Sequence, residues 1–161
     1  MGNSILYRMP SGIPGDVTRR SHSTIEAVML GATPFASFGI FGKVVSGKLV
    51  PIGASDAAAD VYGLLVRAYP TQSASNAQGT AVPPTSGVAD VLRRGYMTVT
   101  NNAGTAALNG VVYVRVANAA AGKPIGGIEA VADSTNTIAI TGARFMSEAD
   151  AGGNVEIAFN I

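Results

Sequence analysis

The chain of 161 residues contains no cysteine, no tryptophan and a single histidine, His22. Without cysteine it can form no disulfide, no thiolate zinc site and no cysteine nucleophile. A histidine-based zinc site or a Ser-His-Asp triad would depend on His22 alone, which lies in a segment that predicts no packed structure. The sequence therefore predicts a protein that is not an enzyme and that holds neither a metal nor another cofactor.

Charge is scarce as well. Charged residues make up 13% of the chain, against about 25% in an average soluble domain. Eleven basic and ten acidic residues leave a formal net charge of +1 and form no basic stripe, so we expect no nucleic-acid partner. Two interpretations of the low charge remain: a surface of small uncharged residues, or a surface covered by other protein subunits. Large uncharged patches usually mark interaction sites, which favours the second.

Long hydrophobic runs are missing too. No apolar run approaches the ~18 residues that a membrane-spanning helix needs. At the N-terminus, the apolar run Ile5–Tyr7 is too short for a signal peptide and is followed by Arg8 and Pro10. We therefore expect no membrane partner, and synthesis in the cytoplasm.

Residues 1–23 differ from the rest of the chain. The segment is rich in glycine and proline, and it carries Arg8, Arg19 and Arg20 besides the histidine. This composition predicts an extended basic arm, and residues 24–161 are predicted to form a single β domain. Such an arm on a compact domain suggests a protein that binds a partner.

Residues 24–161 read as short β-type runs separated by turn residues, at the spacing of an antiparallel sandwich or barrel. The run 24–30 suits a strand buried on both faces. Ser46-Gly47 predicts a hairpin turn, and Pro51 predicts that the following strand lies at a sheet edge. Residues 71–87 predict a long loop, which in a compact domain tends to be functional or mobile. The strand runs are 24–30, 35–45, 48–52, 61–69, 91–100, 111–116, 126–131, 137–140, 143–146 and 154–159.

Two local patterns have competing interpretations. Phe35, Phe38 and Phe41 follow a spacing of three, which could form an aromatic binding stripe but is more typical of core packing. Arg93 and Arg94 could suggest a nucleic-acid patch. Adjacent strand residues face opposite sides, however, so one arginine is expected in solvent and the other in an ion pair.

A third pattern resembles a cation-binding loop. Residues 148–154 contain Glu148, Asp150 and Asn154, but Gly152 stands where a calcium loop needs a ligand. An ordinary hairpin turn is the better interpretation.

Four stretches, in order along the chain, carry a resemblance to a known family. They read Pro-Gly-Asp-Val-Thr-Arg at 14–19, Phe-Gly-Ile-Phe-Gly-Lys-Val at 38–44, Val-Tyr-Gly-Leu-Leu-Val-Arg-Ala-Tyr-Pro at 61–70, and Gly-Ala-Arg-Phe with Val-Glu-Ile-Ala-Phe-Asn at 142–145 and 155–160. Together with the arm, this pattern is similar to the structural cement, or head-decoration, proteins of tailed bacteriophages.

The resemblance implies a jelly-roll or barrel-type β domain on the outer capsid surface of a virion, made in the host cytoplasm. It implies the major capsid protein as partner, bound across neighbouring subunits of the HK97-like fold, and self-association as a homotrimer. The family has no motif that fixes individual contacts. We expect contacts from the arm, the Phe35–Phe41 run and the loop 71–87. The residues expected to contact a partner are Arg8, Pro14, Asp16, Arg19, Arg20, Phe35 and Phe38.

Three other functions stay open at this point. A tail, baseplate or head-completion protein would share the β class and the low charge, and copy number per particle would separate it from a cement protein. A carbohydrate-binding β-sandwich module would need exposed tryptophan or tyrosine, whereas the chain has no tryptophan and five tyrosines. A small hydrolase would need histidine-based chemistry that the sequence does not supply.

Overall fold

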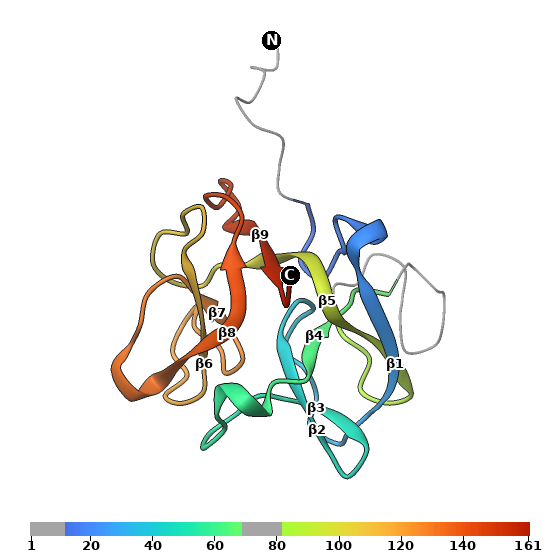
Figure 1. Cartoon of the computed structure of the whole chain (residues 1–161). Coiled ribbons are helices and arrows are strands. Elements are labelled where there is room, and N and C mark those ends of the chain that lie inside the picture. Colours follow the sequence, from blue (N-terminus) through green and yellow to red (C-terminus); the bar gives the residue numbers. More distant parts are fainter. Residues whose placement is uncertain (1–11, 69–81) are drawn as a thin grey trace, which may run out of the picture.

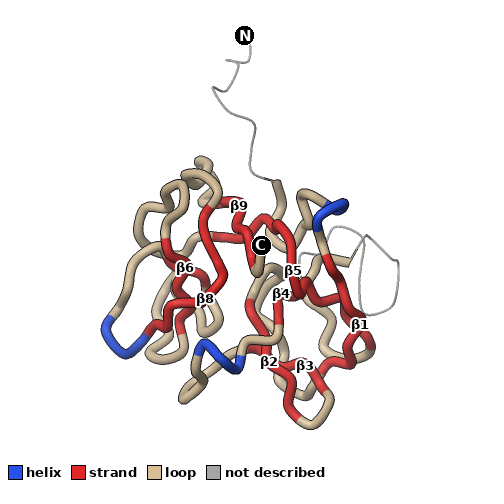
Figure 2. The backbone as a smooth tube through the Cα atoms, viewed as in Figure 1, coloured by secondary structure: helices blue, strands red, loops and turns tan. Residues whose placement is uncertain are grey.

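The structure, a computed structural model, describes residues 12–68 and 82–161. Strands dominate this part of the chain, and its only helical elements are three-residue 3-10 turns (Figure 2). No helix in the described ranges is long and apolar enough to cross a membrane. The predicted all-β class is confirmed. The strands are β1 (Thr24–Leu30), β2 (Phe41–Val45), β3 (Lys48–Pro51), β4 (Gly63–Leu65), β5 (Val88–Thr100), β6 (Val111–Arg115), β7 (Ile128–Glu129), β8 (Thr137–Phe145) and β9 (Asn154–Phe159), and the 3-10 turns are η1 (Arg20–His22), η2 (Ala58–Asp60) and η3 (Ser134–Asn136).

The strands follow the order β1-β3-β2-β4-β5-β9-β8-β6-β7, and β1 pairs in addition with β5. This extra pairing closes β1, β3, β2, β4 and the first half of β5 into a small barrel. The second half of β5 pairs with β9 and so begins a second lobe, which β8, β6 and β7 complete (Figure 1). Among the described pairs of strands, only β1 and β3 run parallel.

Gly95 is the point at which β5 changes partners. On one side of it, Leu92 pairs with Ile25 of β1 and Leu64 of β4; on the other, Gly95 itself pairs with Phe159 of β9. Gly95 has φ +138, and a Cβ placed there would lie 2.3 Å from the hydroxyl oxygen of Ser23. Only glycine fits this backbone conformation and this close approach.

The second lobe closes on β5 from the other side. Just after β5 ends, Asn101 forms a parallel bridge with Ile128 of β7. The N–H of Ala130 donates to the carbonyl of Ala103 at 2.8 Å. The chain thus forms two barrel-like lobes that share one long strand.

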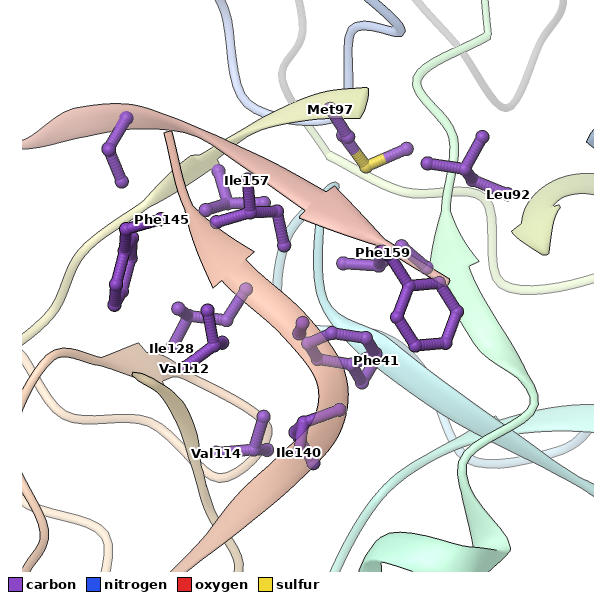
Figure 3. Close-up of a cluster of buried hydrophobic side chains, with 14 of the residues drawn as sticks. Phe41, Leu92, Met97, Val112, Val114, Ile128, Ile140, Phe145, Ile157 and Phe159 are labelled. Atoms are coloured by element: carbon purple, nitrogen blue, oxygen red, sulfur yellow. The ribbon is translucent and has the colours of Figure 1, made fainter. Parts of the chain in front are cut away.

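Each lobe has its own apolar core. Inside the small barrel, Leu49, Leu65 and Val91 belong to a cluster with side chains from every strand of the barrel except β2, so this cluster fills the barrel interior. The other cluster fills the second lobe and also packs against the barrel's outer face (Figure 3). There the rings of Phe41 and Phe159 meet edge to face, 5.3 Å apart between centroids. This packing holds the two lobes together.

A buried ion cluster orders the loop between β6 and β8. Arg115 and Glu129 are 1% and 0% exposed, and the Arg115 Nε lies 2.6 Å from Glu129 Oε1. Arg115 Nη2 lies 2.6 Å from Asp133 Oδ2, and its Nη1 donates to two loop carbonyls. The Arg115 guanidinium holds the pKa of the Asp133 carboxyl below its ordinary value. Because each polar group has partners, the cluster tolerates its burial.

Several strand boundaries differ from the sequence prediction. The run 35–45 becomes a strand only from Phe41, because Gly39 has φ +75 and packs against the backbone of Gly15. The run 61–69 pairs only over Gly63–Leu65, and the run 126–131 only over Ile128–Glu129. The runs 137–140 and 143–146 form one strand, β8.

Two predictions about β3 have different outcomes. The Ser46-Gly47 turn is confirmed, since Val45 pairs with Lys48 across it. The edge position predicted from Pro51 is wrong, because β3 lies between β2 and β1. The proline is tolerated because β1 pairs only with Lys48 and Leu49, so that Pro51 lies beyond that ladder.

We expect Gly95→Ala to lower the free energy of unfolding by about 3 kcal/mol, through the disfavoured backbone conformation and the collision with Ser23. Gly47→Ala is the matched control, since Gly47 has φ +76 but no atom within 4 Å of its built Cβ. It should cost about 1 kcal/mol. Urea unfolding of both variants measures the difference, and equal losses would contradict a special role of Gly95.

Candidate functional site

Residues 12–18, which we name the arm root, are bonded into the sheet. The N–H of Gly15 donates to the Thr98 carbonyl at 2.8 Å, and the N–H of Thr98 donates to the Asp16 carbonyl at 2.9 Å. Val17 forms an antiparallel bridge with Met97. The pairing follows from the change of partners at Gly95: β1 leaves β5 there, so the second half of β5 has one edge free opposite β9. The arm root fills that edge.

Gly15 holds the arm root close to the barrel. Its carbonyl accepts a 2.9 Å hydrogen bond from the N–H of Arg67, which lies just after β4. Its φ is +90, and a Cβ would lie 2.5 Å from the Cβ of Phe38. The close approach therefore requires glycine at this position.

The arm root ends in a charged contact that we name the root latch. Arg19 donates from Nε and Nη2 to the two carboxylate oxygens of Glu156, at 3.2 and 2.7 Å. Its guanidinium lies 4.1 Å from the ring centroid of Tyr96, and the Thr18 hydroxyl donates to the same carboxylate. The hydrogen bond to Glu156 raises the pKa of Arg19 above its ordinary value. The latch joins the chain before β1 to β5 and β9.

A groove of about 530 Å³ lies beside the arm root. We name it the root groove. Its walls come from the arm root, η1, β1, β5 and the segment after β4, and they combine apolar with charged side chains. They include Ile13, Asp16, Val17, Arg20, Ile25, Val66, Arg67, Ala68 and Asp90.

Exposed apolar side chains continue from the groove along β1 and β5. Ile13 and Ile25 are 52% and 43% exposed, Met29 is 49% exposed and Val88 is 62% exposed. Strand β1 is thus largely exposed, and the expectation that it is buried on both faces is wrong. The physical reason is that β1 is a strand of the barrel wall, and no other described element packs against its outer face.

The structure brings together three of the expected contact residues. Asp16 and Arg20 line the root groove, and Arg19 forms the latch. Pro14 lies within the arm root, half-buried. Arg8 and most of the loop 71–87 lie outside the described residues.

Phe35 and Phe38 are placed differently from the other expected contacts. They are 4% and 5% exposed and belong to the barrel core, while Arg67 lies over the Phe38 ring at 5.4 Å. Core packing is thus the correct interpretation of the phenylalanine spacing. Their rings are thus covered almost entirely by the chain itself.

Sequence reasoning did not identify Glu156 and Tyr96 as partners of Arg19. Glu156 is 137 positions away from Arg19, and no local sequence pattern indicates their ion pair. The arginine pair was anticipated correctly. Arg93 lies 3.5 Å from Glu26 and stacks on a tyrosine ring, whereas Arg94 is exposed.

The loop at 148–154 is a hairpin turn, as predicted. Asp150 Oδ1 accepts hydrogen bonds from the N–H groups of Gly152 and Asn154, at 2.9 and 2.8 Å. Within residues 12–68 and 82–161, no group of three or more His, Asp or Glu side chains could hold a metal. The features that stand out in this region are therefore an anchored arm and an apolar surface.

Comparisons with known proteins agree with this description. The family described as XM1 gp53 minor capsid protein matches residues 2–159. No curated protein sequence matches. A chain of the solved structure "The capsid of Myoviridae Phage XM1" has a similar fold, with a TM-score of 0.68 and 18% identity over 99% of this chain and 97% of that chain. The resemblance to phage head proteins is thus confirmed as far as the capsid. The chain belongs to the XM1 gp53 minor capsid protein family and is a structural protein of a phage virion.

Proposed function

We propose that this chain is a non-enzymatic cement protein of a tailed-phage head. It binds the outer capsid surface as a homotrimer and bridges neighbouring subunits of the major capsid protein. The observation that carries the proposal is the bonded arm root. Residues 1–11 lead directly into the arm root, which is hydrogen-bonded to β5. A partner that binds residues 1–11 would therefore be connected to the long strand that both lobes share.

The arrangement suits a load-bearing contact. Tension on the arm acts on the backbone hydrogen bonds of Gly15, Asp16 and Thr18 together, and the latch adds the Arg19–Glu156 ion pair behind them. A segment that becomes ordered on binding covers a large surface for its length, although ordering costs free energy. If the protein binds assembled heads but not free capsid subunits, binding stabilises the shell by mass action.

Self-association is supported by the surface. The apolar side chains of the arm root, β1 and β5 remain exposed in a single copy, although the chain has only 13% charged residues. An exposed apolar face of this kind usually marks a contact with another protein. Closed cyclic symmetry lets each copy cover this face on a neighbour.

Removal of residues 2–11 should abolish binding to heads while the β domain stays folded, because the deletion stops before the arm root. Co-sedimentation with heads that lack the protein measures binding, and thermal unfolding measures stability. A chain with residues 2–11 replaced by a glycine–serine segment of equal length is the control for length and should also fail to bind. Head binding by both altered chains would reject the proposed role of the arm.

Glu156→Gln should weaken head binding roughly tenfold and leave the unfolding free energy within about 1 kcal/mol of the wild type, because the Arg19 side chain is half exposed and exposed pairs contribute little to stability. Asp56→Asn is the matched control: it weakens the ion pair with Lys43 beside β2, away from the latch. Equal head binding by the two variants would show that the latch does not support the arm.

The free protein should sediment as a trimer at micromolar concentration and dissociate on dilution. The physical reason is the apolar face described above, which one copy leaves in water. Sedimentation equilibrium measures the stoichiometry. A monomer at every concentration, or a dimer, would contradict the proposed homotrimer.

A further inference from the structure

Strand β1 has one edge that no described strand covers. It pairs with β5 along residues Thr24–Met29, but with β3 only through Met29 and Leu30. Over residues 24–28, the side of β1 that faces away from β5 therefore has no partner strand in the described part of the chain. An uncovered edge offers backbone N–H and C=O groups to a further strand.

Of the devices that usually protect such an edge, the described residues show only an irregularity in the β1–β5 register between Thr24 and Ile25, at the start of the edge. Proteins block free edges with lysine, proline, bulges or a covering segment. The only charged side chain in residues 24–28 is Glu26, which accepts a hydrogen bond from the Tyr62 hydroxyl and pairs with Arg93. The edge thus carries no free charge that would repel an added apolar strand.

The outward face of β1 continues this unprotected region. Residues 25, 27 and 29 alternate to the same face; Ile25 and Met29 are 43% and 49% exposed, and Ala27 is exposed. Beside Ala27, Asp90 of β5 is exposed and lines the root groove. An apolar strand with one basic residue would match this surface.

The chain itself contains a segment of this composition outside the described residues. Residues 5–9 read Ile-Leu-Tyr-Arg-Met, an apolar run with one arginine, and Pro10 ends it. Its five residues equal the length of the uncovered edge. The other segment outside the description, residues 69–81, contains no Ile, Leu, Val, Met or Phe. It therefore offers no comparable match.

The position of the arm root favours a second copy over the same copy as the source of this strand. Gly12 lies beside Thr98, since a Cβ built on it would be 2.9 Å from the Thr98 hydroxyl oxygen. The uncovered edge of β1 begins at Thr24, opposite Arg94, a path of roughly 13 Å along β5 from Thr98 that passes the bend at Gly95. The three Cα steps from Met9 to Gly12 span at most about 11 Å. A second copy is the occupant that satisfies both the length and the position.

We propose that residues Ile5–Met9 of one copy add as a strand to the uncovered edge of β1 in a second copy. Leu6 and Arg8 face outward with Ile25 and Met29, and Arg8 extends over the small side chain of Ala27 to Asp90. This deepens the self-association proposed above and rests on it, but it does not depend on capsid binding.

The absence of cysteine makes a disulfide test unambiguous. Two differently tagged chains, one with Arg8→Cys and one with Ala27→Cys, are mixed without heads and oxidised mildly. We expect a covalent heterodimer, because directly opposed strand residues fit disulfide geometry. Arg8→Cys mixed with Ala59→Cys, exposed on η2, is the control and should give none. No heterodimer, or as much with the control, would overturn the proposal.

Sedimentation of uncross-linked variants tests the same contact independently. Deletion of residues 2–9 and the substitution Ile25→Lys should each weaken association at least about tenfold. Leu108→Lys, at a 70% exposed position of the second lobe, should leave association unchanged. Unchanged association after the deletion would show that the apolar face binds another surface and would overturn the strand addition. Since no heads are present, failure of capsid binding leaves these results unaffected.

Discussion

The change of partners along β5 is the constraint on which the rest of the structure depends. One continuous strand serves two sheets, so each side of β5 must exchange its neighbour near Gly95. The glycine permits the bend because its φ is +138 and Ser23 leaves no room for a side chain. The exchange joins the barrel to the second lobe by a covalent strand and by the packing of Phe41 on Phe159.

The same exchange creates the region from which the proposals above are argued. When β1 departs, β5 has a free edge, and the arm root takes it through Gly15, Asp16 and Thr18. The departure also leaves β1 at the outside of the barrel, with an apolar face in water and one edge uncovered. The bonded arm root and the exposed face of β1 thus have a common origin.

Much of the fold could be read from the chain, and the failures have physical reasons. Alternating runs and turn residues located every strand, and Ser46-Gly47 located a hairpin, because these signals are local. Strand lengths were less accurate: the run at 61–69 has strong β residues, but its partners β2 and β5 are available only over Gly63–Leu65. Pro51 wrongly suggested that β3 lies at a sheet edge. Where the pairing of β1 with β3 ends depends on strands that are distant in sequence, and a local pattern does not encode it.

By itself, the sequence determined the all-β class, the absence of cysteine chemistry and the poverty of charge that points to protein partners. These properties depend on composition and on short-range periodicity. Only the tertiary structure decided that Arg19 binds Glu156, that Phe35 and Phe38 are core residues, and that β1 is exposed. Contacts between residues more than a hundred positions apart depend on strand order, and no local pattern in this chain encodes that order.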